Sequence, residues 1–299
     1  MSRNKIANAL KRKHKRWTDS IEDEAVRKLA QKNSYITGGA IVSLLQGEEP
    51  NDYDIYFTNK ETTLAIVKYY AEQWNRTHSR SVEVQDVEGR VRVYVASKGI
   101  VSEDEEDQRA VDMGMDEEKL QQTKEKRKPY RPRFMSSNAI TLSDDIQLVF
   151  RFYGQPEEVH KNFDFIHCTM VFKPIYAYRA TGKLTLPAEA LEALIFNQLT
   201  YIGSRYPLAS ILRTKKFIKR GWKINAGQYL KMVMQLQELD LKNFNVLEEQ
   251  LTGVDFYYFM EVIETIKAKQ EAEPDFNIDS AYMIEVIDKV FDGKDEELE

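Results

Sequence analysis

The spacing of apolar residues predicts a chain built differently in its two parts. Up to about residue 184, apolar positions alternate with polar ones or form short runs bounded by turn residues, a pattern typical of strands interleaved with helices. From residue 187, apolar residues recur at three- and four-residue intervals, which is typical of helices. We therefore predict an α+β protein. A mixed β-sheet head with flanking helices covers residues 1–184, and an all-helical region covers residues 185–299.

The expected strands are rich in β-branched and aromatic residues, and they cover residues 34–36, 53–58, 79–87, 90–96, 138–142, 146–152 and 163–172. The expected helices have the 3.6-residue period or a proline at the start, and they cover residues 40–46, 60–76, 156–163, 186–202, 207–221, 226–240, 255–270 and 279–291. Residues 99–134 are too charged for a core, so we expect a long loop or a partly disordered insertion there.

Composition narrows the class of protein. With 13 Gly, 8 Pro and 42% hydrophobic residues among 299, the chain is neither collagen-like nor wholly disordered. The single cysteine, Cys168, excludes an intrachain disulfide framework and indicates a reducing compartment. No apolar run is long enough to span a bilayer, and the basic N-terminus lacks the apolar core of a secretory signal. We expect a cytoplasmic protein with no membrane partner.

The charge is distributed in blocks. The net charge of −5 argues against a protein that coats nucleic acid over its whole surface. Residues 1–16 nevertheless carry seven Lys or Arg and no acid, and residues 119–133 and 205–223 are also basic. Each block alone is typical of a solvated face. Three of them in an acidic chain favour a polyanion held at selected places.

Two short motifs carry candidate chemistry. Gly38 and Gly39 follow an apolar strand and precede a helix, where glycine lets the backbone come close to a phosphate. Asp52 and Asp54 stand two apart in an expected strand, so both carboxylates project from one face. Two carboxylates on one face suit Mg²⁺ or Mn²⁺, and paired metal ions clamp a triphosphate and activate an attacking hydroxyl. A solvated strand edge is the alternative.

This combination resembles the signature of the polymerase-β nucleotidyltransferase superfamily, and within it the class II tRNA nucleotidyltransferase (CCA-adding) and poly(A) polymerase branch. The matching residues are Gly38-Gly39, Leu44-Leu45, Gly47 and Asp52-Tyr53-Asp54. Residues 161–170 are similar to a second motif of the branch through Asp164 and Phe165, and residues 207–224 to a third through Arg213 and Lys216. Residues 136–168 are also similar to uncharacterised bacteriophage nucleotidyltransferase-like proteins, which would place the chain in the host cytoplasm.

The resemblance implies a template-independent nucleotidyltransferase that moves a nucleoside monophosphate from an NTP to an acceptor, most simply an RNA or tRNA 3′ hydroxyl. It implies catalytic roles for Asp52, Asp54 and Asp164, with Mg²⁺ or Mn²⁺ on Asp52 and Asp54. The nucleotide-binding residues that it implies are Gly38, Gly39, Ser43, Arg213 and Lys216. For Asp164, metal binding, substrate contact and a buried structural role all stay open. His160 and His167 are interpreted as core or surface histidines.

The sequence also departs from the branch. Val42-Ser43 stands where the branch has Arg-Asp, and Asn162-Phe163 stands where it has two arginines. Two alternatives follow. One is transfer of the nucleotide onto a protein hydroxyl, as a toxin or host-takeover protein would do. The other is a non-catalytic module that keeps the fold and grips RNA or a partner. Retention of both Asp-x-Asp carboxylates favours an enzyme.

Overall fold

The computed structural model describes residues 2–78, 81–87, 90–95, 100–103, 128–241, 243–251, 265–269, 271–273 and 279–291. The chain forms two compact units, the first of residues 1–161 and 166–196 and the second of residues 162–165 and 197–299. The units divide after residue 196, whereas the predicted boundary follows residue 184. The difference arises because α8 (Ala188–Ile195) packs against the 3₁₀ turn Ile166–Thr169 of the first unit.

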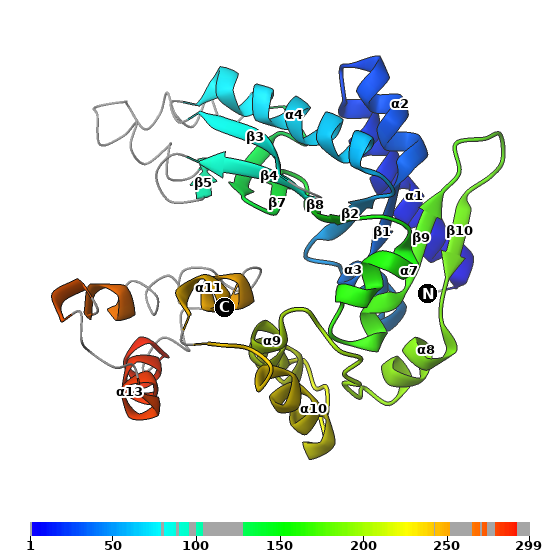
Figure 1. Cartoon of the computed structure of the whole chain (residues 1–299). Helices are drawn as coiled ribbons and strands as arrows, with labels where there is room; N and C mark the ends of the chain where they lie inside the picture. The colour runs from blue at the N-terminus through cyan, green and yellow to red at the C-terminus, as the bar shows by residue number, and fades with distance from the viewer. Residues whose placement is uncertain are drawn as a thin grey trace, which may run out of the picture. The chain divides into compact units, whose positions relative to one another are not determined.

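A mixed β-sheet organises the first unit (Figure 1). Its spatial order over the described residues is β10 (Gly182–Thr185), β9 (Val171–Pro174), β1 (Ser34–Thr37), β2 (Tyr53–Phe57), β8 (Ile146–Tyr153), β7 (Ala139–Leu142), β6 (Pro132–Ser136) and β5 (Ile100–Ser102). The pair β2–β8 is parallel and each other neighbouring pair is antiparallel. A separate hairpin joins β3 (Val82–Val87) to β4 (Arg90–Val95), as predicted. The α+β prediction is confirmed.

Helices pack around this sheet (Figure 1). Over the described residues of the first unit they are α1 (Arg3–Ser20), α2 (Glu24–Asn33), α3 (Gly39–Gln46), α4 (Lys60–Thr77), α7 (Pro156–Val159) and α8. α4 begins where the Asn59 side chain accepts the Thr62 N–H at 2.9 Å. It buries Ile66, Tyr70 and Trp74 at four-residue spacing and packs against α2 and the β3–β4 hairpin.

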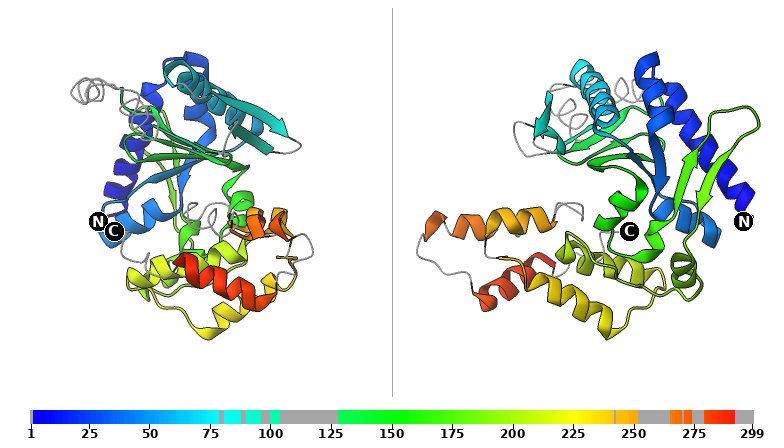
Figure 2. Two further views of the ribbon diagram at one scale, coloured as in Figure 1. Left: turned by 90° about the vertical axis from the view of Figure 1, so that its left-hand side faces the viewer. Right: turned by 45° about the vertical axis from the view of Figure 1, so that its right-hand side comes forward.

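Helix α1 was not predicted, because its block of cations hid an apolar stripe. Ile6, Leu10 and Trp17 are fully buried, and their spacing is helical. The Trp17 indole N–H donates to the Tyr70 hydroxyl at 2.9 Å, which fixes α1 to α4. Both views of Figure 2 show α1 along the outside of the first unit, and the right-hand view shows it beside the β9–β10 hairpin. The basic block is therefore one face of an ordered helix.

The predicted strand over residues 163–172 is mostly wrong. Only Val171–Pro174 forms a strand, while Ile166–Thr169 is a 3₁₀ turn and Asp164 lies in a bend. The Asp164 carboxylate accepts the N–H of Phe165 at 3.0 Å, a local bond that competes with strand pairing. The aromatic composition that suggests a strand instead places Phe165 in the core of the second unit.

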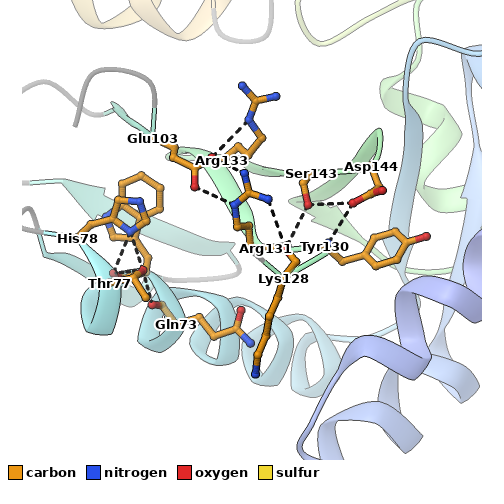
Figure 3. A network of polar contacts seen from close by, with 11 residues as sticks. Gln73, Thr77, His78, Glu103, Lys128, Tyr130, Arg131, Arg133, Ser143 and Asp144 are labelled. Atoms are coloured by element: carbon orange, nitrogen blue, oxygen red, sulfur yellow. Dashed lines mark hydrogen bonds and ion pairs between the residues drawn. The ribbon is translucent and has the colours of Figure 1, made fainter. Parts of the chain in front are cut away.

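The described ends of the predicted insertion, residues 99–134, are ordered. β5 and β6 pair as antiparallel strands, and Glu103 at the end of β5 is buried. Its carboxylate accepts two hydrogen bonds from Arg131, from Nε at 2.8 Å and Nη2 at 3.0 Å, and lies 3.6 Å from Arg133 (Figure 3). The rest of the predicted insertion, residue 99 and residues 104–127, lies outside the described residues.

The second unit is helical, as predicted. Over the described residues its helices include α9 (Pro207–Lys219), α10 (Ala226–Leu236), α11 (Phe244–Leu251) and α13 (Ser280–Phe291), and residues 265–269 are also helical. Edge-to-face ring contacts link Phe165 to Tyr201 and to Phe217, and Phe217 to Trp222. Most of the helix predicted over residues 255–270 lies outside the described residues. Over the described parts of both units, none of the helices combines the length and the apolar character that a membrane crossing requires.

Candidate nucleotide site

The turn between β1 and α3 brings Gly38 against Asp54. Gly38 has φ 86° and ψ −151°, a conformation that L side chains rarely adopt. A Cβ atom added to Gly38 would lie 2.9 Å from Asp54 Oδ2. The Gly38 N–H donates to the Cys168 carbonyl at 3.2 Å, so it is already engaged. Gly38 therefore lets a carboxylate approach the turn, and the approach of a phosphate stays a prediction.

The two carboxylates of the Asp-x-Asp motif have different settings. Asp54 lies in β2, half-buried, directly opposite Thr37 of β1 in the strand register. Asp52 is exposed and immediately precedes the strand, so the predicted in-strand spacing holds for Asp54 alone. The position of Asp54 is thus fixed by strand pairing, whereas Asp52 is exposed just before the first residue of β2.

Thr37, which immediately precedes the glycine turn, contacts His160, and this contact was not predicted from the sequence. The Thr37 hydroxyl donates to the Met170 carbonyl at 2.7 Å and lies 2.9 Å from His160 Nε2. Burial lowers the pKa of His160 to about 4, so the ring is neutral near pH 7 and shares one hydrogen bond with the Thr37 hydroxyl. Thr37 precedes the glycine turn, a signal that could have marked it, whereas nothing in the local pattern links it to His160.

Helix α3 presents its N-terminus at the same turn. Gly39 is its first residue, and a Cβ added there would meet nothing within 4 Å. Ser43 follows four residues later, so it shares the face of Gly39 and is half-buried. The first N–H groups of a helix have no acceptor within the helix and attract anions. The open side of the turn at Gly39 can therefore accept a phosphate.

The chemistry of the donors fits a hard divalent cation. Among the described residues, no group of three or more His, Cys, Asp and Glu forms a ready metal cluster. Mg²⁺ commonly binds through one or two carboxylates and completes its shell with water and substrate phosphates. Asp54, beside a turn open to phosphate, matches the position of one such carboxylate, and Asp52 precedes it by two residues.

The remaining predicted site residues belong to the second unit. Asp164 is buried, and its Oδ2 lies 2.7 Å from Arg213 Nη1 in a salt bridge. Arg213 and the exposed Lys216 both lie on α9, three residues apart. The structure therefore brings together Gly38, Asp54 and the start of α3 in one unit, and Asp164 with Arg213 in the other. A single site that contains both groups stays a prediction.

Comparisons with solved structures give only weak likenesses. The CCA-adding enzyme of Thermotoga maritima in complex with tRNA is 12% identical, with a TM-score of 0.38, over 90% of this chain and 57% of that chain. The CCA-adding enzyme of Bacillus stearothermophilus in complex with CTP is 14% identical, with a TM-score of 0.34, over 80% of this chain and 50% of that chain. At these levels the likenesses carry no information about activity.

Comparison with known sequences identifies the family. The Gabija anti-defense 2 protein of Bacillus phage SPbetaL7 is 23% identical over 278 residues, which are 91% of this chain and 52% of that protein. The chain thus spans about half the length of this relative. The model of the Gabija anti-defense 2 family matches residues 8–195, which include the glycine turn, Asp52 and Asp54. The chain belongs to the Gabija anti-defense 2 family.

Proposed function

We propose that this chain counters the Gabija defence by nucleotidyl transfer, moving a nucleoside monophosphate from an NTP to a macromolecular hydroxyl. The observation that carries the proposal is the approach of Asp54 to Gly38, since an added Cβ would lie 2.9 Å from the carboxylate. A backbone shaped to hold a carboxylate beside an anion-attracting helix N-terminus suits a metal-bound triphosphate. An RNA or tRNA 3′ hydroxyl is the acceptor that the sequence resemblance favours.

Each candidate site residue of the first unit has a defined role in this proposal. Asp52 and Asp54 would hold Mg²⁺, which supplies charge neutralisation at the triphosphate. The α3 N-terminus at Gly39, with Ser43 on the same face, would orient the phosphates. Thr37 and His160 would keep the turn rigid. The acceptor oxygen forms a bond to the α-phosphorus, pyrophosphate departs, and the hydroxyl proton passes to solvent.

A non-catalytic role is the second candidate, and one observation favours it. Asp164, which the resemblance assigns to the site, already has both carboxylate oxygens engaged, by the Phe165 N–H and by Arg213. A module that had lost transfer activity could retain the fold and grip RNA or a protein partner. The two candidates differ in whether any product is covalently labelled.

A labelling experiment separates these candidates. The chain is incubated with each α-labelled NTP, Mg²⁺ or Mn²⁺, and cell lysate, and the labelled product is then treated with ribonuclease or protease. Ribonuclease-sensitive label supports transfer to RNA, and protease-sensitive label supports transfer to a protein. Asp54→Asn should abolish labelling, while Glu72→Gln, an exposed carboxylate on α4, should leave it unchanged. Absence of label with every NTP and lysate would favour the non-catalytic candidate.

A phage assay tests the counter-defence role. Cells that carry the Gabija defence and express the chain should allow more plaques than cells without the chain. If transfer is the mechanism, Asp54→Asn should lose this effect at equal protein levels, and Glu72→Gln should keep it. Full activity of Asp54→Asn would show that any counter-defence acts without transfer.

A further inference from the structure

The sheet face that carries Asp54 continues as a row of polar side chains across two more strands. Asp54 of β2 lies directly opposite Gln147 of β8, and Gln147 lies directly opposite Thr141 of β7. Residues opposite each other on paired strands share a face, so these three side chains project from the same side of the sheet. All three are half-buried. The two strands beyond β2 thus extend the Asp54 side of the candidate site.

The adjacent row of the same three strands belongs to the core. Ile55, Leu148 and Ile140 lie opposite one another in the strand register, and all three are fully buried. This alternation is the pattern of a sheet with one apolar face and one polar face. The apolar core is therefore packed on the opposite face, and it does not account for the amide and the hydroxyl in the Asp54 row.

The polar groups of Gln147 and Thr141 are not engaged by the protein. Within the part of the chain that the structure describes, the Gln147 amide and the Thr141 hydroxyl make no hydrogen bond to another group. Thr37 differs, although it lies opposite Asp54 on the other side, because its hydroxyl donates to the Met170 carbonyl. Half-buried polar groups without a protein partner are satisfied by water or by a ligand.

The order of the strands separates these two groups from the phosphate end of the candidate site. Helix α3 follows β1, and β1 and β8 lie on opposite sides of β2. A nucleotide with its terminal phosphates at Gly39 and its α-phosphate at Asp54 therefore extends toward β8 with its remaining part. Adjacent strands are about 4.8 Å apart, so a single strand spacing leads from Asp54 to Gln147.

We propose that Gln147 and Thr141 form a subsite for a ribose, whose hydroxyls they hydrogen-bond beside Asp54. The inference rests on the proposed function, since that function places an α-phosphate at Asp54. An amide and a hydroxyl both donate and accept hydrogen bonds, as ribose hydroxyls do, and neither carries the positive charge that favours a phosphate. The ribose is joined to the α-phosphate through a single methylene group, whereas the base lies beyond the ribose.

Two riboses meet at an α-phosphate during transfer to RNA. One belongs to the incoming NTP, and the other carries the acceptor hydroxyl, which must come into line with the α-phosphorus and the leaving pyrophosphate. Both riboses present the same hydroxyl chemistry to the protein. Replacing ribose by 2′-deoxyribose in one ligand at a time therefore identifies which of them the subsite holds.

Equilibrium binding to the full chain tests the subsite without requiring transfer. The ligands are the α,β-methylene analogues of the four NTPs with Mg²⁺, and an RNA oligonucleotide, each compared with a counterpart that has 2′-deoxyribose in the nucleotide or at the 3′ terminus. The wild type should bind the ribose form of at least one ligand about two- to ten-fold more tightly, the effect of one hydrogen bond. Gln147→Met, which keeps the size of the side chain, should bring this ratio close to one, and Thr141→Val should lower it.

A matched control separates the subsite from a general effect of the substitution. Gln31→Met makes the same change at a half-buried amide on α2 and should leave the ratio unchanged. The ribose subsite is rejected if the wild type binds neither ligand or does not distinguish ribose from deoxyribose in either. It is also rejected if the ratio persists in Gln147→Met, or if Gln31→Met lowers the ratio as much.

The labelling experiment judges the transfer function separately. Label that depends on Asp54, together with a binding ratio that Gln147→Met does not change, would support transfer and reject the ribose subsite. A ratio that is lost in Gln147→Met, without label from any NTP, would support the subsite and reject transfer.

Discussion

Asp164 and Arg213 form a salt bridge of 2.7 Å within the second unit, between residues 49 apart in the sequence. The Asp164 side chain is only 7% exposed, whereas the Arg213 side chain is 37% exposed. The sequence resemblance assigns both residues to substrate or metal contacts. In the structure each has the other as a partner, so the pair holds the bend at residues 162–165 against α9.

The unequal burial of this pair predicts unequal costs of breaking it. Arg213→Ala leaves a buried carboxylate without its cation and should lower the free energy of unfolding by about 2 to 3 kcal/mol, below the range for a fully buried pair because Arg213 is partly exposed. Asp164→Ala should cost less, since the freed guanidinium can turn to water. Urea unfolding of both variants measures the difference. Equal stability of Arg213→Ala and the wild type, with loss of transfer, would restore the substrate-binding role.

A second buried carboxylate should behave in the same way. Glu103 is 3% exposed, and its carboxylate accepts two hydrogen bonds from the Arg131 guanidinium (Figure 3). Arg131→Ala leaves the buried Glu103 carboxylate without its two hydrogen bonds and removes the link between the ends of β5 and β6, so we expect a loss of about 2 to 4 kcal/mol in the free energy of unfolding. Lys128→Ala is the control, because its pair with Glu22 is exposed and should contribute nothing measurable. A similar effect of both changes in urea unfolding would contradict this account.

Prediction from sequence succeeded where local pattern and tertiary contacts agree. The segment from β1 through α3 to β2 has alternating apolar residues, two glycines and a helix-ending Gly47, and it forms as expected. It failed over residues 163–172, because a local bond to Asp164 outcompetes strand pairing. It also missed α1, whose apolar stripe is visible at Ile6, Leu10 and Trp17 once the cations are set aside.

In the candidate site, too, contacts between neighbouring elements were predictable from the sequence, whereas contacts between distant positions were not. The proximity of Gly38 and Asp54 was predictable, because a turn that follows one strand faces the neighbouring strand. The contact of Thr37 with His160 joins positions 123 apart in the sequence, and no local periodicity encodes it. The pairing of Asp164 with Arg213 is equally non-local, so the motif resemblance had no means to distinguish a structural ion pair from a substrate contact.

Buried His14 should make stability depend on pH. Its ring lies between Tyr176 and Ser34 and against Trp17, and burial lowers its pKa from 6.5 to about 3. The unfolded chain therefore takes up this proton first as pH falls, and the stability contribution is complete above pH 6.5 and is lost progressively down to about pH 3. At pH 5 the loss should be about 2 kcal/mol, at about 1.4 kcal/mol for each pH unit.

His14→Gln tests this dependence, because Gln does not titrate. The variant should be less stable at pH 7, through loss of packing, but its stability should fall less between pH 7 and pH 5 than that of the wild type. His160, whose pKa is lowered to about 4, contributes in the same direction in both proteins and cancels in the comparison. Urea unfolding at the two pH values gives the four free energies. Identical pH dependence of variant and wild type would show that His14 is accessible to protons in the folded state.

The two adjacent glycines of the turn provide the sharpest test of the candidate site. Gly38→Ala forces a side chain into a φ of 86° and places its Cβ 2.9 Å from Asp54 Oδ2, so it should cost about 1 to 3 kcal/mol and abolish transfer. Gly39→Ala enters open space at the first residue of α3 and should leave stability near that of the wild type. If the triphosphate packs on this backbone, Gly39→Ala should still raise the KM for NTP.

The double variant Gly38→Ala, Asp54→Ala tests the contact between Gly38 and Asp54 itself. Removing the carboxylate should restore part of the stability lost in Gly38→Ala, while the backbone strain remains. If the two costs are simply additive, the approach of Asp54 to the turn is not what requires glycine at this position, and the principal support for a metal-bound nucleotide there is lost.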